Sequence, residues 1–231
     1  MDYYAGGSLA QRLELGCLCE AAVAFYCGEV VLCLEYLHSH HIIYRDLKPE
    51  NVLLDSEGHV HLVDFGLCKC CGAFSSHAEP SPKKSPLRKR RRWSTGGTEA
   101  YLPPEVRRRG EYDATVDWWA LGVMMWELLT GDVPKDRLVK PDDMSMCAFN
   151  ACYRLLEANR EKRLGVGGSV EVKNHPFFRD LEWDALIERR VTVPWIPPSE
   201  EVSSDSPIDL SNDSPTDLTI TDFSFTESSL C

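Results

Sequence analysis

A cluster of charged and amide side chains lies in the segment IIYRDLKPENVLL, residues 42–54. Its members are Arg45, Asp46, Lys48, Glu50 and Asn51, and a further carboxylate, Asp64, follows in the short sequence DFG. Carboxylate and amide oxygens are ligands that Mg²⁺ takes in proteins together with phosphate oxygens. A lysine two residues beyond Asp46 could meet the negative charge that develops on a transferring phosphate. These residue types at this spacing therefore suit phosphoryl transfer, in which the protein mainly positions reactants and neutralises charge.

The elements around this cluster follow from the apolar periodicity of the chain. Residues 20–38 carry apolar side chains at three- and four-residue steps, which is typical of a helix packed on a core. Residues 51–54 and 59–63 are short β-type runs separated by a glycine-containing turn. Because the two strands of such a hairpin run antiparallel, we expect Asp46 and Asp64, which flank it, to lie close together.

The rest of the chain predicts a mainly α fold with one small β-hairpin. Residues 116–130 are apolar almost all round and are followed by a glycine, which indicates a buried helix with a glycine cap. Residues 145–157 indicate another helix, and the stretch HPFF at residues 175–178 is expected to close the packed region. Residues 68–97 are rich in Ser, Pro, Gly and basic side chains without an apolar period, which predicts a long exposed loop.

Cysteine usage and hydropathy indicate the cellular compartment in which the chain is expected. Apart from two C-x-C pairs, Cys17/Cys19 and Cys68/Cys70, its ten cysteines show no repeated pair spacing, and no signal peptide precedes them, which indicates reduced thiols in an intracellular protein of the cytoplasm or nucleus. The sequence CKCC at residues 68–71 lacks a second Cys or His pair at a finger-like distance, which argues against zinc. The apolar stretch near residues 116–129 is interrupted by acidic residues and is too short to cross a bilayer, so no membrane span is expected.

The motifs YRDLKPEN, DFG and PPE, in that order and followed by DWWALGVMMWELLTG, resemble the catalytic, magnesium-binding and activation segments of eukaryotic protein kinases. The resemblance implies ATP and Mg²⁺ as cofactors. It implies Asp46 as the base that orients and deprotonates a substrate hydroxyl, and Lys48 as a contact to the transferring phosphate. Asn51 and Asp64 would ligate magnesium, and Glu50 would join them as a cofactor-binding residue. A lysine followed by Pro-Glu-Asn is similar to the serine/threonine type of kinase.

Three further stretches are similar to the AGC group, the relatives of protein kinases A, G and C that include the ribosomal kinases. They are RLGVGGSVEVKNHPFF, LEWDALIERRVTVPWIPP and the tail sequence ITDFSF. The resemblance implies a kinase domain over residues 1–178, a basic activation-loop insert at residues 68–97 within it, and an AGC-type C-terminal tail over residues 179–231. In this group the tail is phosphorylated at a Ser/Thr position that Ser224 matches. A Ser-rich tail with chance aromatic residues is the alternative.

Other residues of the resemblance have structural roles. Glu105 of the PPE stretch would form a salt bridge with Arg163, and Asp117 would hydrogen-bond the catalytic loop. Both assignments agree with the rule that buried charges require partners. Tyr44 stands where the family commonly has histidine, a change also found among its active members.

A basic run precedes the expected activation-loop phosphorylation site. Seven of the ten residues 83–92 are Lys or Arg, and Ser94 and Thr95 follow directly. By resemblance Ser94 takes the place of the phosphorylation site, and Arg45 would hold its phosphate through a bidentate contact. Arginines precede both hydroxyl residues at the spacing that basophilic kinases favour, so we hypothesise that this loop is itself a kinase substrate or an inhibitory mimic of one. A solvated charged loop and a nuclear localisation signal are alternatives of equal weight.

The expected partners are protein substrates with basic residues near the target Ser/Thr, and an upstream activating kinase. Glu50 and Glu127 match positions that contact arginines in basophilic kinases. Ser8 stands where a glutamate is frequent in such kinases. Whether the substrate needs an arginine far upstream of the target Ser/Thr is therefore undecided. Nucleic-acid binding is not expected, because no aromatic platform accompanies the basic run and the chain has a net charge of -11.

A complete kinase also has a glycine-rich loop over the phosphates, a strand lysine and a helix glutamate. None of these is found here, and the first residues resemble the hinge between the two lobes, so the predicted fold is a kinase-like large (C-terminal) lobe without the small N-terminal lobe. The region of residues 134–151 is also shorter than its counterpart in the family. Two functions stay open: a serine/threonine kinase that is intact only in a longer form of the chain, and an inactive large-lobe fragment that acts as a binding or decoy module.

Overall fold

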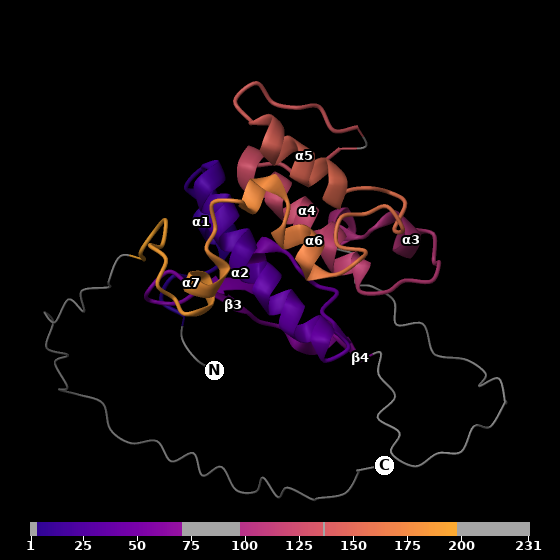
Figure 1. The fold of residues 1–231 in the computed structure, drawn as a ribbon, viewed down its shortest axis with the longest axis horizontal. Helices are drawn as coiled ribbons and strands as arrows, with labels where there is room; N and C mark the ends of the chain where they lie inside the picture. Colours follow the sequence, from indigo (N-terminus) through magenta and orange to yellow (C-terminus); the bar gives the residue numbers. More distant parts are fainter. Residues whose placement is uncertain (1–3, 71–97, 136, 198–231) are drawn as a thin grey trace, which may run out of the picture. The chain divides into compact units, whose positions relative to one another are not determined.

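The computed structural model describes residues 4–70, 98–135 and 137–197 of the chain. The chain divides into two units, Met1–Ser199 and Glu200–Cys231, and the second lies outside the described residues. Figure 1 shows the order of the elements in the first unit. The helices are α1 (Leu9–Glu14), α2 (Glu20–Ser39), α3 (Pro104–Arg107), α4 (Thr115–Thr130), α5 (Met146–Leu155), α6 (Ser169–Lys173) and α7 (Trp183–Ile187). The strands are β1 (Ile42–Ile43), β2 (Val52–Leu54), β3 (Val60–Leu62) and β4 (Lys69–Cys70), and short 3₁₀ helices are η1 (Pro49–Asn51), η2 (Phe65–Leu67), η3 (Thr98–Tyr101) and η4 (Pro176–Phe178).

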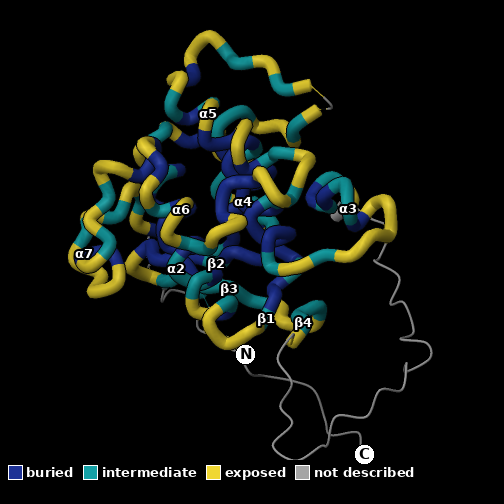
Figure 2. The backbone as a smooth tube through the Cα atoms, turned by 45° about the vertical axis from the view of Figure 1, so that its right-hand side comes forward, coloured by how far each residue is buried: buried dark blue, intermediate teal, exposed yellow. Residues whose placement is uncertain are grey.

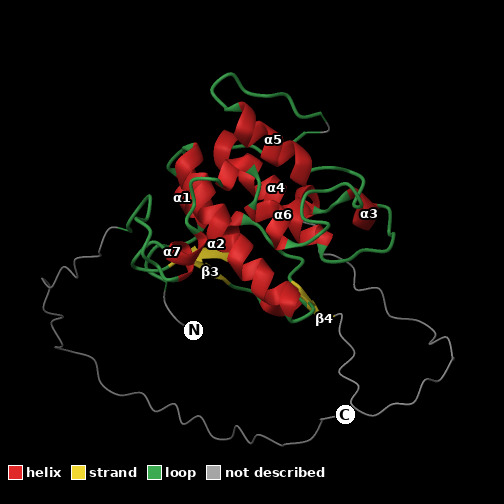
Figure 3. Cartoon of the chain, in the orientation of Figure 1, coloured by secondary structure: helices red, strands yellow, loops and turns green. Residues whose placement is uncertain are grey.

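The predicted mainly α fold is confirmed for the described residues. Figure 3 shows helices throughout this unit and strands only in short pairs. The predicted helices over residues 20–38, 116–130 and 145–157 correspond to α2, α4 and α5. α4 packs against both α2 and α5, and Figure 2 shows it as almost continuously buried. These helices therefore form the centre of the core.

Two glycines shape α4. Gly131 follows the helix with a φ of 79°, a left-handed conformation that glycine adopts without a steric penalty, so the predicted glycine cap is confirmed. Gly122 lies where α4 crosses α5, and a Cβ atom there would lie 2.7 Å from the Cβ of Leu155. The close approach of the two helices consequently depends on a residue without a side chain.

The predicted hairpin is also present. β2 and β3 pair antiparallel, with Val52 opposite Leu62 and Leu54 opposite Val60. A second antiparallel pair joins β1 to β4, with Ile43 opposite Lys69. The prediction that residues 68–97 form one exposed loop is therefore wrong at its start, because Lys69–Cys70 form a strand. Residues 71–97 lie outside the described residues.

Packing continues beyond the HPFF stretch that was expected to close it. Leu186 of α7 is buried, and Trp195 packs partly buried against the core. The carbonyl of Trp195 also lies beside Gly58 in the turn between β2 and β3. The domain boundary at residue 178 stays a prediction, but the packed unit includes side chains from the segment after it.

One described helix, α2, is long and apolar enough to cross a membrane by length and composition. However, 67% of its apolar window is buried inside this unit. Its acidic side chains also have partners there, since Glu29 accepts a hydrogen bond from His59 Nδ1 at 2.6 Å and Glu35 accepts one from Lys173 Nζ at 2.7 Å. These contacts are those of a core helix in a packed domain.

Candidate active site

The loop that carries Asp46 is fixed by its backbone. Tyr44 and Leu47 are buried in the core, and between them Arg45 has a φ of 70°, which is unusual for a residue with a side chain. The carboxylate of Asp117 accepts hydrogen bonds from Tyr44 N at 2.9 Å and from Arg45 N at 2.8 Å. The prediction that Asp117 anchors this loop is confirmed by these two bonds.

The two carboxylate oxygens of Asp46 have different surroundings. Oδ2 accepts a hydrogen bond from Asn51 Nδ2 at 2.8 Å and lies 3.3 Å from Lys48 Nζ. Oδ1 is buried and has no hydrogen-bond partner among the described residues. Because Asp46 is only 5% exposed, this oxygen is a buried acceptor that lacks a donor. The cluster read from the sequence is thus assembled, with one oxygen left for a further group.

The hairpin brings Asp64 to the same end as Asn51. Val63 N donates to the carbonyl of Asn51 at 3.1 Å, and the Tyr44 hydroxyl donates to the carbonyl of Val63. Asp64 itself is exposed, has a φ of 56°, and accepts a hydrogen bond from Gly66 N at 3.2 Å through Oδ1. The two ends of the hairpin therefore meet, while the expected closeness of the Asp46 and Asp64 side chains stays a prediction.

These residues fit a magnesium ion that takes few protein ligands. The amide nitrogen of Asn51 is engaged by Asp46, which leaves its carbonyl oxygen as the group available to a metal. Oδ2 of Asp64 is a second hard oxygen at the same end of the hairpin. In the described part of the chain, no group of three or more His, Cys, Asp or Glu residues could hold a metal by itself. A magnesium site does not require such a group, because magnesium usually binds one or two carboxylates together with phosphate oxygens and waters.

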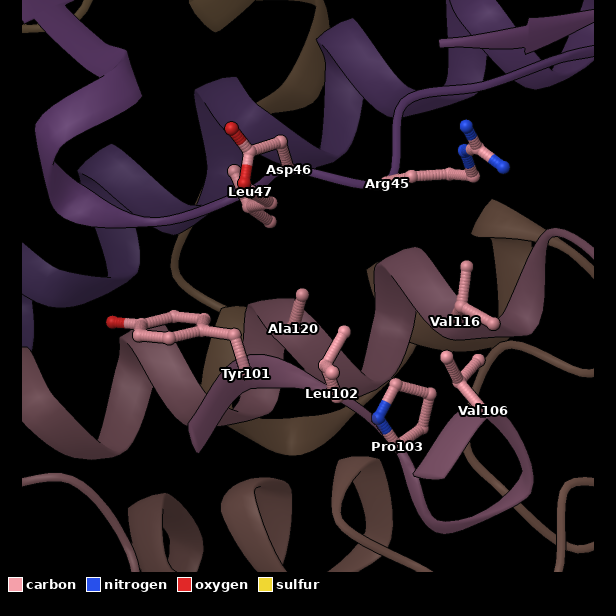
Figure 4. Close-up of a pocket in the computed structure, with 9 residues that line it drawn as sticks. All are labelled: Arg45, Asp46, Leu47, Tyr101, Leu102, Pro103, Val106, Val116 and Ala120. Atoms are coloured by element: carbon pink, nitrogen blue, oxygen red, sulfur yellow. The ribbon is translucent and has the colours of Figure 1, made fainter. Parts of the chain in front are cut away.

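Arg45 points away from Asp46, as Figure 4 shows. Its Nε donates to the carbonyl of Leu67 at 2.6 Å, and its Nη1 donates to the hydroxyl of Tyr112 at 2.5 Å. Lys69 Nζ lies 4.2 Å from the centroid of the same Tyr112 ring. Two cations therefore flank one phenol ring. Lys69 and Tyr112 were not predicted from the sequence, because the pairing of β1 with β4 that brings Lys69 to this place has no local signal.

Glu50 lies close enough to Glu127 of α4 for its charge to affect the pKa of Glu127. Glu127 of α4 accepts a hydrogen bond from the hydroxyl of Tyr101. Burial raises the pKa of Glu127 above its usual range, the bond from Tyr101 opposes this, and the negative charges of Glu50 and Asp132 add to it. Burial and the bond to Glu127 also raise the pKa of Tyr101. Two crowded carboxylates of this kind favour a bound cation.

A small pocket separates the catalytic loop from the segment that precedes α3. Figure 4 shows Asp46 and Arg45 on one side of it and Tyr101, Leu102 and Pro103 on the other. Val106, Val116 and Ala120 complete the lining. Asp46 therefore borders an otherwise mostly apolar wall.

The candidate phosphorylation sites Ser94, Thr95 and Ser224 lie outside the described residues, as does the basic run at residues 83–92. The predicted salt bridge between Glu105 and Arg163 is confirmed, with Arg163 Nη1 and Nη2 donating to the two carboxylate oxygens at 2.7 and 3.0 Å.

Comparison with known proteins shows which family has this sequence. A family model described as the protein kinase domain matches residues 1–178. The chain belongs to the protein kinase family. Among curated proteins, the kinase is 40% identical over 214 residues to the serine/threonine-protein kinase Sgk1 of Xenopus tropicalis, covering 85% of this chain and 48% of that protein. It is 38% identical over 222 residues to the serine/threonine-protein kinase gad8 of Schizosaccharomyces pombe, covering 90% of this chain and 36% of that protein.

A third relative is the serine/threonine-protein kinase N2 of Danio rerio, 38% identical over 213 residues, which cover 85% of this chain and 20% of that protein. The predicted AGC-type serine/threonine kinase is confirmed at the level of the family by these relatives. The kinase chain spans about half or less of the length of the relatives it matches. The match to the family model begins at residue 1 and does not confirm that a small lobe is absent, so that part of the fold prediction stays a prediction.

Proposed function

We propose that this protein transfers the γ-phosphate of ATP to Ser or Thr hydroxyls of basic protein substrates, with Mg²⁺ as the cofactor. The observation that carries the proposal is the unequal environment of Asp46. One of its oxygens is held by Asn51 and Lys48, and the other is buried with no donor in the part of the chain that the structure describes. A buried acceptor without a partner is costly, and a hydroxyl group from a substrate would satisfy it.

The roles of the residues follow from their positions. Asp46 Oδ1 accepts the proton of the substrate hydroxyl, while Asn51 fixes the carboxylate from its other side. Lys48, 3.3 Å from Asp46, is placed to meet the charge of the phosphoryl group as it moves to the hydroxyl oxygen. When bound, magnesium would be held by Asn51 and Asp64 and would neutralise charge on the phosphates of ATP.

Substrate choice and activation are assigned to two further groups of charged residues. Glu50 and Glu127 would receive an arginine of the substrate, since their crowded negative charges favour a cation. Arg45 with its neighbour Lys69 would receive a phosphate added by an upstream kinase, for which Ser94 is the candidate position. Thr95 and Ser224 are further candidates for phosphorylation.

We also propose that the described residues correspond to the large lobe of a kinase. Between residues 4 and 197, the described β-structure consists of two two-stranded sheets. The groups that cover the ATP phosphates from above would then come from a longer form of the protein.

The test is phosphate transfer from radiolabelled MgATP to an arginine-rich serine peptide, with this 231-residue chain and with any longer form of the protein. Asp46→Asn keeps the shape of the side chain and removes the base, so transfer should fall by about 10²- to 10⁴-fold. Asp143→Asn makes the same change at an exposed position and should leave the rate unchanged. Equal rates for the wild type and Asp46→Asn in a form that transfers phosphate would refute the role of Asp46.

A further inference from the structure

Three consecutive arginines, Arg107, Arg108 and Arg109, lie at the end of α3 and in the loop that follows it. All three are exposed, and Figure 2 shows the exposed stretch beside α3. Arg107 donates from Nη2 to the carbonyls of Glu99 at 3.1 Å and Ala100 at 3.3 Å. The guanidinium groups of Arg108 and Arg109 form no hydrogen bond or ion pair within the described residues. This arginine cluster therefore presents positive charge that the described residues do not neutralise.

Unpaired cations are unexpected in a chain in which 36 acidic residues face 25 Lys and Arg residues. Two acidic residues near the cluster in sequence pair elsewhere, Glu105 with Arg163 and Asp113 with Arg160. Arg109 also has a φ of 60°, a left-handed conformation that costs energy for a residue with a side chain. Neither ion pairing among the described residues nor the local backbone thus explains the cluster.

The arginine cluster follows directly after the wall that faces Asp46. Arg107 is the next residue after Val106, which lines the pocket beside Asp46. Figure 4 shows Val106 and Tyr101 at opposite ends of this lining. The hydroxyl of Tyr101 donates to the carboxylate of Glu127. The wall therefore has an acidic group at one end and the arginine cluster at the other.

We propose that the arginine cluster binds acidic residues that follow the target Ser or Thr in the substrate. This inference rests on the proposed function, in which Glu50 and Glu127 receive an arginine of the substrate. A peptide with that arginine before the target, and with its hydroxyl group at Asp46, continues past the target toward the cluster. Guanidinium groups bind carboxylates through paired, charge-assisted N–H···O bonds. The opposite charges at the two ends also disfavour a peptide bound in the reverse direction.

The test compares two peptides that differ only after the target position. Both carry arginines before the target, and alanine replaces the target so that binding is measured without transfer. One peptide continues with glutamates and the other with glutamines, and fluorescence anisotropy gives the Kd of each for the whole chain. The charge-reversed variant combines Arg108→Glu with Arg109→Asp, because aspartate tolerates the left-handed backbone at residue 109. The matched control combines Arg179→Glu with Arg190→Glu, the same change of charge at exposed residues outside the cluster.

The wild type should bind the glutamate peptide about tenfold more tightly, because one exposed ion pair contributes a factor of up to about five and two or three act together. Added salt should weaken this preference. The charge-reversed variant should prefer the glutamine peptide, and the control should keep the wild-type preference.

Equal or undetectable binding of the two peptides by the wild type would overturn the proposal. A preference that persists in the charge-reversed variant, or that is lost equally in the control, would also overturn it. Tighter binding of a single-stranded oligonucleotide than of the glutamate peptide would assign the cluster to nucleic acid and overturn it as well.

Phosphate transfer separates this proposal from the proposed function. In a form that transfers phosphate, the serine versions of the two peptides should differ about tenfold in kcat/KM. The difference should lie in KM, because the cluster contributes binding and does not touch the reacting atoms. Transfer without this difference would overturn the role of the cluster and leave the proposed function intact. If no form transfers phosphate, the proposed function fails, while the anisotropy experiment still decides whether the cluster binds acidic residues.

Discussion

Neutralising Glu105 should strongly destabilise the described unit, because it leaves the charge of Arg163 buried. Arg163 has no exposed surface. Besides its two bonds to Glu105, it donates from Nε to the carbonyl of Glu157 at 3.0 Å and from Nη1 to that of Thr115 at 3.1 Å. Its guanidinium carbon also lies 5.0 Å from the centroid of the Trp119 ring. These contacts would keep Arg163 inside when Glu105→Gln removes the opposing charge.

The size of the effect follows from the burial of the pair. Loss of one partner from a buried ion pair costs about 3–5 kcal/mol, because the remaining charge is left uncompensated. Glu105 retains 12% exposure of its side chain, so the lower end, about 3 kcal/mol, is expected here. For a domain of this size, about 2–4 °C of Tm accompanies each kcal/mol, which gives a fall of about 6–12 °C.

Urea unfolding followed by tryptophan fluorescence measures the change, with thermal melts as a second readout. Glu188→Gln is the matched control, because Glu188 pairs with Arg190 at the surface, where the two side chains are 58% and 63% exposed. Exposed pairs contribute little, and the control should stay within about 0.5 kcal/mol of the wild type. A loss below about 1 kcal/mol for Glu105→Gln, or equal losses in the two variants, would falsify this account of the pair.

Two further predictions concern groups around Asp46. Tyr44→Phe should lower the free energy of unfolding by about 1–2 kcal/mol, because the carbonyl of Val63 loses its donor. The control Tyr36→Phe, at a residue that is 65% exposed, should change the free energy of unfolding little. Equal losses for the two variants in urea unfolding would contradict the prediction. Because the pKa of Glu127 is raised in the folded chain, its contribution to stability is greatest while the carboxyl is protonated, below its usual pKa, and is lost as the pH rises through the raised value. Glu127→Gln should therefore gain stability relative to the wild type between pH 4 and pH 7.5, and a difference independent of pH would contradict the assignment.

Much of the helical core could be predicted because its pattern is local. The apolar steps of α2 and the continuous apolar run of α4 are visible in single windows of sequence, and Gly131 marks the end of α4. The capping box of α1 is also a local pattern, a serine followed three residues later by a glutamine, although no helix was predicted from it. In the structure Ser8 and Gln11 bond each other reciprocally. α1 could therefore have been predicted.

Other features depend on contacts that no local pattern contains. β1 and β4 have two residues each, too few for a period, and their paired residues, Ile42 with Cys70 and Ile43 with Lys69, are far apart in the sequence. The bond from Tyr101 to Glu127 likewise joins segments 26 residues apart. The unpaired oxygen of Asp46 depends on which way the amide of Asn51 turns. Motifs could indicate which residues take part, whereas the structure is needed to show which atoms are already engaged.

The hydrogen bonds around the catalytic loop separate the groups that hold Asp46 from the atom that would react. Asp117 holds the backbone, and Asn51 and Lys48 both engage Oδ2, whereas Oδ1 of Asp46 has no donor among the described residues. A substrate hydroxyl would then complete a set of hydrogen bonds and would not have to displace one. Because an unpaired buried acceptor is costly, binding of the correct acceptor relieves that cost at the point where the proton must be taken. An alanine at the same position of a peptide would leave Oδ1 unpaired, so the geometry that would make Asp46 a base would also favour peptides that carry a hydroxyl group.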